Sequence, residues 1–149
     1  MDVSGNIGAI LSQKSGDIYS VSPDATVFEA VAMLDQKNVG AVLVMDGDKL
    51  VGLFSERDYT RKVVLRGKRS RETKVSEIMS TDLKVVRPQE GVETCLRLMT
   101  DKRIRHLPVI DGGKVVGVIS IGDLVKWVIA TQSAAIAHLE SYISGGYTG

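Results

Sequence analysis

The sequence is poor in the residues from which disulfides and metal centres are built. Its 149 residues include one cysteine, Cys95, and two histidines, His106 and His138. A single cysteine excludes an intramolecular disulfide, and we expect a reducing, cytoplasmic compartment. Zinc sites draw several Cys, His or acidic ligands from short spacings, which these three residues do not provide, so we expect no metal site. Cys95 falls on the apolar face of a predicted helix, which favours a buried small hydrophobic residue over a nucleophile.

The chain also lacks a strong net charge and a long apolar run. Lysines and arginines number 19 against 18 acidic residues, so the net charge is +1 and no global field favours nucleic acid or an anionic membrane. No run approaches the roughly 18 apolar residues of a membrane span. The N-terminus has no basic start followed by an apolar segment, so we expect no signal peptide. With 44% hydrophobic residues the composition is globular, and any anion site must be local.

What the sequence does contain is an internal duplication. Segment 17–64 matches segment 82–129 without a gap when the chain is offset by 65 residues, which places Pro23 on Pro88. An ungapped match of this length indicates a duplicated structural unit. Further identical pairs are Val27 and Val92, Val44 and Val109, Gly52 and Gly117, Ser55 and Ser120, and Asp58 and Asp123.

Each repeat has the hydrophobic pattern of a β-α-β-β-α unit. Apolar residues between Val27 and Leu34, and between Val92 and Met99, recur at helical spacing. The apolar run that follows each helix does not alternate, as expected for a strand buried on both faces. An Asp-Gly pair then marks a hairpin turn. Strands are predicted at 18–21, 41–45 and 50–54 and at 83–86, 106–110 and 115–119, with second helices beginning at Ser55 and Ser120.

One such unit is too small to bury a sheet alone, so we expect two units packed as a pseudo-two-fold pair in the α/β (α+β) class. A helical turn at 75–79 is expected to lead into the second repeat, with a counterpart at 7–14. The last helix is expected to continue through Trp127, which would face a second copy, to about residue 143. The predicted boundaries are an N-terminal helical segment at 1–16, domains at 17–65 and 82–130, a linker with a short helix at 66–81, and a C-terminal extension and tail at 131–149.

The strongest local signal is a motif that occurs once in each repeat, GLFSERD at 52–58 and GVISIGD at 117–123. Both have a glycine, two apolar residues, a serine, two variable residues and an aspartate, at the predicted junction of a strand with a helix. One interpretation is a capping box, in which the serine caps the helix and the acid bonds back to it. Such caps are common and need no ligand, so the motif alone favours capping.

A second interpretation makes the same geometry a ligand site. A helix N-terminus presents free N–H groups that suit an anion, and a serine hydroxyl there can donate to a phosphate. A carboxylate can accept from both hydroxyls of a ribose, and glycine lets the backbone approach a flat base closely. Because the motif is duplicated, two such sites would face a common cleft.

The duplicated unit, the doubled motif and the run IRHLPVID at 104–111 together resemble a pair of cystathionine-β-synthase-type (CBS) domains, also called a Bateman module. The resemblance covers residues 7–129, most of the chain. It implies a stand-alone, non-catalytic regulatory protein whose homodimer forms a disc of four CBS units. It also implies binding of AMP, ADP, ATP, S-adenosylmethionine or NAD(H), with AMP the first candidate, and signalling of nucleotide, energy or redox state to a partner protein in trans.

The resemblance also assigns site residues position by position. The matching residues are Asp58 and Asp123 for the ribose, Ser55 and Ser120 for the hydroxyl position, and Leu53 and Val118 for the contact with the base. In the family, the aspartate of one unit faces the early strands of the other. By that rule, Asp123 is expected to act with Lys14, Tyr19, Val39, Gly40 and Ala41, and Asp58 with Met79, Lys84, Ile104, Arg105 and His106.

The two expected sites differ in charge. Arg105 and His106 stand where relatives place basic residues for phosphate, whereas the first repeat has a neutral pair there. Arg57, just before Asp58, adds a further cation. A phosphate about 4 Å from one arginine gains roughly 4 kcal/mol at an effective dielectric constant of about 20, before desolvation. The Asp58 site is therefore predicted to be the stronger phosphate site, and its cations argue against S-adenosylmethionine.

Other functions remain open at this stage. A purely structural dimerisation module would use the Ser-x-x-Asp pairs only as helix caps. An enzyme such as a nucleotide hydrolase has less support, because no phosphate-binding loop follows a strand and the motifs lack a partner base. The basic stretch 61–74 raises nucleic-acid binding, but it has no recognition helix or aromatic platform, so we interpret it as a solvated linker.

Overall fold

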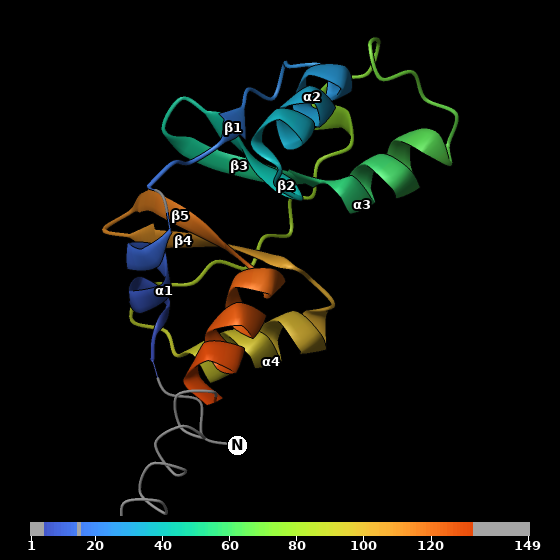
Figure 1. Ribbon diagram of the computed structural model, residues 1–149. Coiled ribbons are helices and arrows are strands. Elements are labelled where there is room, and N and C mark those ends of the chain that lie inside the picture. Colours follow the sequence, from blue (N-terminus) through green and yellow to red (C-terminus); the bar gives the residue numbers. More distant parts are fainter. Residues whose placement is uncertain (1–4, 15, 133–149) are drawn as a thin grey trace, which may run out of the picture. The chain divides into compact units, whose positions relative to one another are not determined.

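The computed structural model describes residues 5–14 and 16–132. They form two compact units, which are described separately (Figure 1). The first unit comprises residues 17–85 and 110–117, and the second comprises the described residues of 1–16, 86–109 and 118–149. His138 and the expected end of the last helix lie outside the described residues. Within the described part of the chain, no helix has both the length and the apolar character needed to cross a membrane.

The first repeat has the predicted β-α-β-β-α order. The element bounds are β1 (Ser20–Val21), α2 (Val27–Lys37), β2 (Ala41–Asp46), β3 (Lys49–Ser55), α3 (Glu56–Asp58) and a π-helical turn (Tyr59–Val64) that continues α3. The strands pair in the order β1-β2-β3, with β1 parallel to β2 and β2 antiparallel to β3. The first four residues of β2 are all buried, as predicted from its unbroken apolar run. The predicted fold class is therefore confirmed.

The second repeat follows the same order. Helix α4 (Val92–Lys102) precedes the two-stranded sheet of β4 (His106–Asp111) and β5 (Lys114–Ser120), and β5 leads into the helix of residues 121–132. This last helix is coloured orange to red in Figure 1.

The first strand of the second repeat departs from prediction. The segment 83–86 forms only a single parallel bridge, between Val86 and Val109. In the first unit, the Leu43 N–H donates to the Tyr19 carbonyl at 3.1 Å and so extends the pairing of β1 with β2. The residue equivalent to Leu43 is Pro108, which has no N–H to donate. The predicted strand is therefore reduced to one bridge.

Helices α2 and α4 both end on a residue in the left-handed conformation. Asn38 has a φ of 53° and Arg103 a φ of 55°. This conformation closes the last helical turn and redirects the chain. In each unit the residues that follow, 39–41 and 104–106, therefore enter the sheet directly, and both segments contain predicted site residues.

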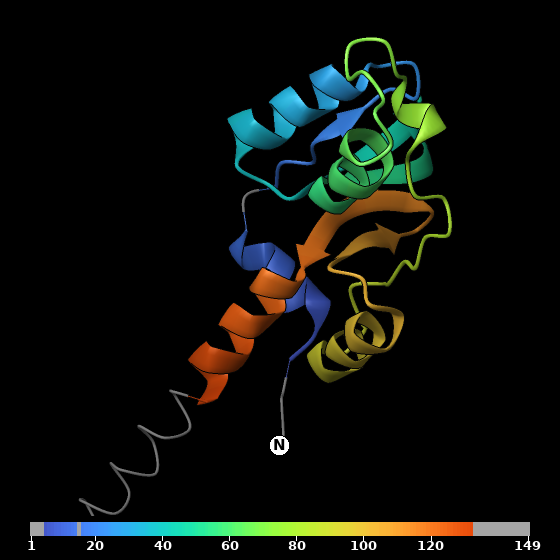
Figure 2. The same ribbon diagram turned by 90° about the vertical axis from the view of Figure 1, so that its right-hand side faces the viewer.

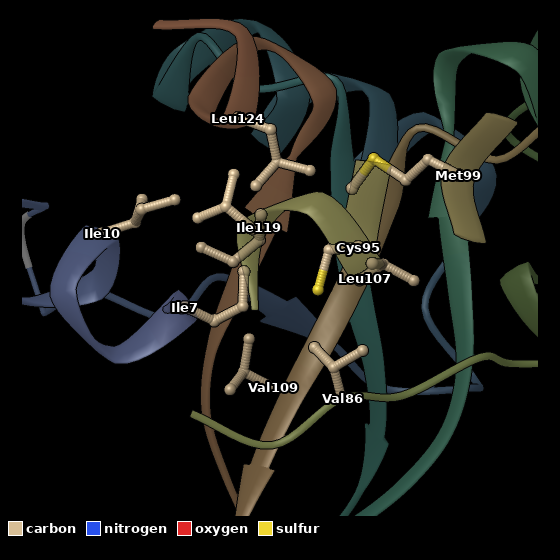
Figure 3. Close-up of a cluster of buried hydrophobic side chains, with 10 residues drawn as sticks. Ile7, Ile10, Val86, Cys95, Met99, Leu107, Val109, Ile119 and Leu124 are labelled. Atoms are coloured by element: carbon tan, nitrogen blue, oxygen red, sulfur yellow. The ribbon is translucent and has the colours of Figure 1, made fainter. Parts of the chain in front are cut away.

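Each unit incorporates a short helical segment that precedes the other repeat in the sequence. Helix α1 (Ile7–Gln13) buries Ile7 and Ile10 beside Leu124 of the helix of residues 121–132 and Ile119 of β5 (Figures 2 and 3). Conversely, the turn Val75–Glu77 buries Val75 in the core of the first unit. The turn expected to lead into the second repeat thus packs with the first repeat. The core of the second unit consists of Ile7, Ile10, Val86, Val92, Cys95, Met99, Leu107, Val109, Ile119 and Leu124.

The basic segment 66–74 packs against the first unit. The Thr73 carbonyl accepts from the Val27 N–H at 2.8 Å, and the Ser70 carbonyl accepts from the Phe28 N–H at 3.1 Å. These bonds satisfy two N–H groups of the first turn of α2, which have no partner within the helix. The guanidinium carbon of Arg71 also lies 3.8 Å from the centre of the Phe28 ring. Most residues of this segment are nevertheless exposed, and its interpretation as a linker stays a prediction.

Trp127 contributes to the core of its own chain. Its side chain is half-buried against the core of the second unit. A Cβ placed on Gly5, whose φ is 103°, would lie only 2.6 Å from Cζ2 of the indole ring. The structure therefore favours an intramolecular role for Trp127 over the expected contact with a second copy. The exposed large apolar side chains of the same helix are those of Val125 and Ile129.

Candidate functional site

Both Ser-x-x-Asp motifs form capping boxes. In the first unit, the Asp58 N–H donates to Ser55 Oγ at 3.2 Å and the Ser55 N–H donates to Asp58 Oδ2 at 3.0 Å. In the second unit, the Asp123 N–H donates to Ser120 Oγ at 3.1 Å and the Ser120 N–H donates to Asp123 Oδ2 at 2.9 Å. The capping interpretation is confirmed, and it fixes each carboxylate at the junction of a strand with a helix.

The Asp58 corner, which consists of Ser55, Asp58, Lys62 and Ser80, is closed by its own side chains. Asp58 is only 6% exposed. Its Oδ2 also accepts from the Ser55 hydroxyl at 3.0 Å, and its Oδ1 accepts from the Ser80 hydroxyl at 3.0 Å and lies 2.9 Å from the Lys62 ammonium. Both carboxylate oxygens are therefore engaged, and the buried charge is compensated within the unit.

The segment that supplies Ser80 lies along β3. Leu53 and Ser80 exchange two backbone hydrogen bonds, of 3.0 and 2.9 Å. A Cβ placed on Gly52 would clash with the Met79 sulfur and would lie 3.2 Å from the Ser80 carbonyl oxygen. Gly52 is therefore needed for this close approach. The structure thus brings two predicted site residues, Leu53 and Met79, to the same part of the unit as Asp58.

The Asp123 corner, which consists of Lys14, Val118, Ser120 and Asp123, is more open. The Asp123 side chain is 22% exposed, against 7% for the Asp58 side chain, whereas Lys14 and Lys62 are both 36% exposed. The Lys14 ammonium donates to Asp123 Oδ2 at 2.7 Å and to the Val118 carbonyl at 2.9 Å. Among the described residues, every contact of the Asp123 carboxylate is made by Oδ2. In that part of the chain Oδ1 is therefore left available as an acceptor.

The contacts of Asp123 decide its charge. Burial raises the pKa of this carboxyl, but hydrogen bonds from Lys14 and Ser120 outweigh burial and leave the pKa below its ordinary value of 3.8. Asp123 is therefore ionised at neutral pH. Lys14 is held in place by α1, whose Ile7 and Ile10 are buried in the core of the second unit. Burying an isoleucine fully stabilises by about 1.5–3 kcal/mol.

Arg105 and His106 lie beside the start of the helix of residues 121–132. The Ile121 N–H donates to the Arg105 carbonyl at 2.8 Å. The first unit repeats this contact, because the Glu56 N–H donates to the Gly40 carbonyl at 3.0 Å. In both units, the segment after the first helix is thus bonded to the first turn of the second helix.

His106 is within electrostatic reach of the Asp123 corner. Burial lowers the pKa of His106 below its ordinary value of 6.5, Asp123 opposes this shift, and Lys14 and Arg105 add to it. His106 is therefore neutral at pH 7. A bound anion would change this balance, because it would favour the imidazolium form.

Most of the other predicted site residues lie in the unit of their own repeat. Tyr19, Val39, Gly40 and Ala41 belong to the first unit with Asp58, whereas Ile104 belongs to the second with Asp123. Lys84 pairs with Asp82 at 3.4 Å, and Arg57 is exposed. The pairing of each aspartate with segments of the other repeat stays a prediction.

Sequence analysis does not identify two residues of the Asp58 corner, Lys62 and Ser80. Lys62 carries a usable signal, because an acid and a lysine four residues apart on a helix face each other. Ser80 has no local signal, since its contact with Asp58 depends on the approach of residues 79–80 to β3. A search for polar residues at short spacing would not find it.

Neither Cys95 nor a cluster of metal-ligating side chains forms a further site among the described residues. Cys95 is fully buried, and burial, followed by the nearby Glu90 carboxylate, raises the pKa of its thiol to about 11. A buried, protonated thiol is a poor nucleophile, so its prediction as a buried hydrophobic residue is confirmed. Within the described residues, no three His, Cys, Asp or Glu side chains gather as a metal site requires.

Comparison with known proteins agrees with this architecture. The CBS domain family matches residues 7–65 and 75–130. The chain is 42% identical over 129 residues to the CBS domain-containing protein CBSX3, mitochondrial, of Arabidopsis thaliana, which covers 83% of the chain and 63% of that protein. It is 36% identical over 120 residues to the CBS domain-containing protein YhcV of Bacillus subtilis, covering 80% of the chain and 85% of YhcV.

A solved structure gives the same result. A protein with CBS domains from Burkholderia ambifaria is 46% identical, superposes with a TM-score of 0.83, and covers 86% of this chain and 96% of its own. The chain belongs to the CBS domain family and carries two CBS domains in tandem, the arrangement known as a Bateman module.

Proposed function

We propose that this protein is a non-catalytic regulatory module that binds an adenosyl ligand and signals nucleotide, energy or redox state to a partner protein in trans. AMP is the first candidate ligand, with ATP, ADP and NAD(H) next. The observation that carries the proposal is the duplicated corner, because each CBS domain holds one aspartate carboxylate at the start of a helix, bonded to a backbone N–H group.

The Asp123 carboxylate suits the ribose of such a ligand. Lys14 and Ser120 hold Oδ2 in place, whereas Oδ1 has no partner among the described residues. Hydrogen bonds from ribose hydroxyls to a charged acceptor are worth about 1.5–3 kcal/mol each. The Asp58 carboxylate would have to exchange Ser80 or Lys62 for the same hydroxyls, since both of its oxygens are engaged.

Basic groups near the Asp123 corner suit a phosphate. Arg105 and His106 adjoin the start of the helix of residues 121–132, and Lys14 adds a second cation. A phosphate would stabilise the imidazolium form of His106, so nucleotide binding would be accompanied by proton uptake near neutral pH. The family's crossed arrangement assigns Arg105 and His106 to Asp58 instead, and that assignment also stays a prediction.

A distant solved structure supports the class of ligand. The CBS domain pair of protein MJ0100, 22% identical with a TM-score of 0.72, was crystallised with 5′-methylthioadenosine and S-adenosylmethionine. At this identity the similarity concerns the fold alone, so the ligand of the present chain is inferred from its own residues. The cations Lys14 and Arg105 disfavour a sulfonium ligand and favour a nucleotide.

The assembly we propose is a homodimer. A hexameric CBS-CP12 protein, 30% identical with a TM-score of 0.72, is known as a structure. In the present chain, the helix of residues 121–132 leaves Val125 45% and Ile129 59% exposed, and a second copy would cover them. A purely structural dimerisation module is the second candidate function, because it needs only this surface and the two helix caps. The compartment also stays a prediction.

The test is the shift in melting temperature with AMP, ATP, NADH and S-adenosylmethionine. A ligand at about 100 times its dissociation constant adds roughly 2.7 kcal/mol, which is several degrees for a protein of this size. We expect a shift with at least one nucleotide, and its loss in Asp123→Asn. Glu29→Gln is the matched control, because Thr26 and Glu29 form the same capping box at α2.

The outcomes separate the two functions. If no ligand shifts the melting temperature at millimolar concentration, the regulatory proposal fails and the structural module takes its place. If Asp123→Asn and Glu29→Gln lose the ligand shift equally, the aspartate acts only through helix capping.

A further inference from the structure

The two lysines that pair with the site aspartates, Lys62 and Lys14, differ in how many of their ammonium N–H groups have a hydrogen-bond acceptor. In the Asp58 corner, the Lys62 ammonium lies 2.9 Å from Asp58 Oδ1, 3.1 Å from the Ile78 carbonyl oxygen and 3.5 Å from Ser80 Oγ. An ammonium has three N–H groups, so Lys62 has a partner for each of them.

The Lys14 ammonium has two acceptors among the described residues for its three N–H groups. It donates to Asp123 Oδ2 and to the Val118 carbonyl, and these are its partners among the described residues. The third N–H therefore has no protein acceptor in that part of the chain. The side chains of Lys14 and Lys62 are both 36% exposed, so the two lysines differ in their partners and not in their exposure. A ligand bound at the Asp123 corner could therefore accept a hydrogen bond from this third N–H of Lys14.

The charge of the corner points the same way. Lys14 neutralises Asp123 at 2.7 Å. The backbone carbonyl of Arg105 accepts from the Ile121 N–H at the same helix start, and the charge of Arg105 acts on the neighbouring His106. The charges of Lys14, Asp123 and Arg105 sum to about +1 at neutral pH. An anionic group on the ribose is attracted to such a corner, and a sulfonium is repelled.

Resting on the proposed function, we propose that Lys14 is the specificity-determining residue of the Asp123 corner and selects ligands whose ribose carries a phosphate. Its first two bonds hold Asp123 Oδ2 and leave Oδ1 for the ribose hydroxyls. Its third N–H receives the anionic group. The corner therefore prefers AMP over adenosine, and adenosine over S-adenosylmethionine.

The test compares the dissociation constants of AMP, adenosine and S-adenosylmethionine by calorimetry, in the wild type, Lys14→Met and Lys14→Arg. Lys14→Met is expected to weaken AMP by about tenfold or more, the loss expected when a charge-assisted hydrogen bond is removed. Adenosine is expected to change by less than about threefold, and S-adenosylmethionine to bind more tightly, because the Asp123 charge is no longer neutralised. Lys14→Arg is expected to keep the wild-type order.

Lys102→Met is the matched control, since Lys102 is an exposed lysine at the end of α4 in the same unit. It is expected to bind all three ligands as the wild type does. If Lys14→Met is folded and keeps the wild-type ratio of AMP to adenosine affinity, the specificity role is overturned while the proposed function stands. If the wild type binds none of the three ligands, the proposed function fails, and the role of Lys14 fails with it.

Discussion

The Asp58 corner and the Asp123 corner occupy equivalent positions of a duplicated unit, yet they are closed to different degrees. The Asp58 side chain is 7% exposed and is held through both oxygens by Ser55, Ser80 and Lys62. The Asp123 side chain is 22% exposed and is held through Oδ2. The capping box is common to both corners, so the difference arises outside the motif.

The cation of each corner comes from a different element. Lys62 lies one helical turn after Asp58, and its equivalent in the second repeat is Trp127, which is half-buried against the core of the second unit. Lys14 comes from the end of α1, and its equivalent 65 residues later is Met79, which packs against Gly52 in the first unit. Both corners thus keep the same helix cap, but the lysine that pairs with the aspartate differs in origin. Lys62 comes from the helix that Asp58 caps, whereas Lys14 comes from a separate segment. The first arrangement engages both oxygens of Asp58, whereas the second leaves Asp123 Oδ1 without a partner among the described residues.

The largest expected effect is the difference in stability between Asp58→Ala and Asp123→Ala. Removing Asp58 leaves Ser55, Ser80 and the 36% exposed Lys62 without their shared partner, which is expected to cost about 2 kcal/mol through the lost hydrogen bonds to a buried carboxylate. Removing Asp123 is expected to cost about 1 kcal/mol, the value of a helix cap. Urea unfolding measures both, and an unchanged m-value confirms that the midpoint shift reports stability.

Glu29→Ala calibrates this comparison. It removes the acid of the capping box at α2, which pairs with no lysine among the described residues, so it measures the loss of the cap alone. Equal losses for Asp58→Ala and Asp123→Ala would contradict the distinction between a closed and an open corner.

A smaller effect is expected from pH, because His106 lies near only one corner. Its pKa in the folded state is lowered from 6.5 by burial, with Asp123 opposing and Lys14 and Arg105 adding to the shift. The unfolded chain therefore binds more protons than the folded chain just below pH 6.5, and stability is lost as the pH falls through this range. His106→Asn is expected to flatten the pH dependence of the unfolding free energy there.

Asp123 adds a separate, more acidic window. Its folded pKa lies below 3.8, so its contribution is present above that value and is lost as the pH falls further. His106→Asn should leave this acidic loss in place. A pH dependence just below 6.5 that is the same in His106→Asn and in the wild type would show that His106 is not the group responsible.

Much of the fold could be predicted because the duplication makes every element appear twice. The pairing of Val27 with Val92 and of Ser55 with Ser120 fixes the order of helices and strands without long-range information. The capping boxes could also be predicted, since a cap depends on residues three positions apart. The position of the candidate carboxylates at strand–helix junctions follows from the same local rule.

The remaining features depend on contacts between distant segments. Nothing near Ser80 in the sequence shows that it contacts Asp58. The packing of α1 with the second repeat depends on the burial of Ile7 and Ile10 among residues that lie far from α1 in the sequence. The closed state of the Asp58 corner could not be predicted for this reason. The basic composition of segment 66–74 likewise conceals the backbone bonds that it makes to the first turn of α2.

The smallest expected effect concerns the first strand of the second repeat, where Pro108 stands in place of Leu43. Pro108→Leu restores an N–H at the position from which Leu43 donates to the Tyr19 carbonyl. One hydrogen bond adds about 1 kcal/mol, and the loss of proline's restraint on the unfolded chain removes about 0.4–1 kcal/mol. The net stability change is therefore expected to be small, whereas the new amide should be protected from hydrogen exchange. Protection would show that one proline distinguishes the sheets of the two repeats, because it alone removes the donor. An amide at position 108 that exchanges as fast as an unbonded one would mean that the segment 83–86 is held away from β4 by its own contacts.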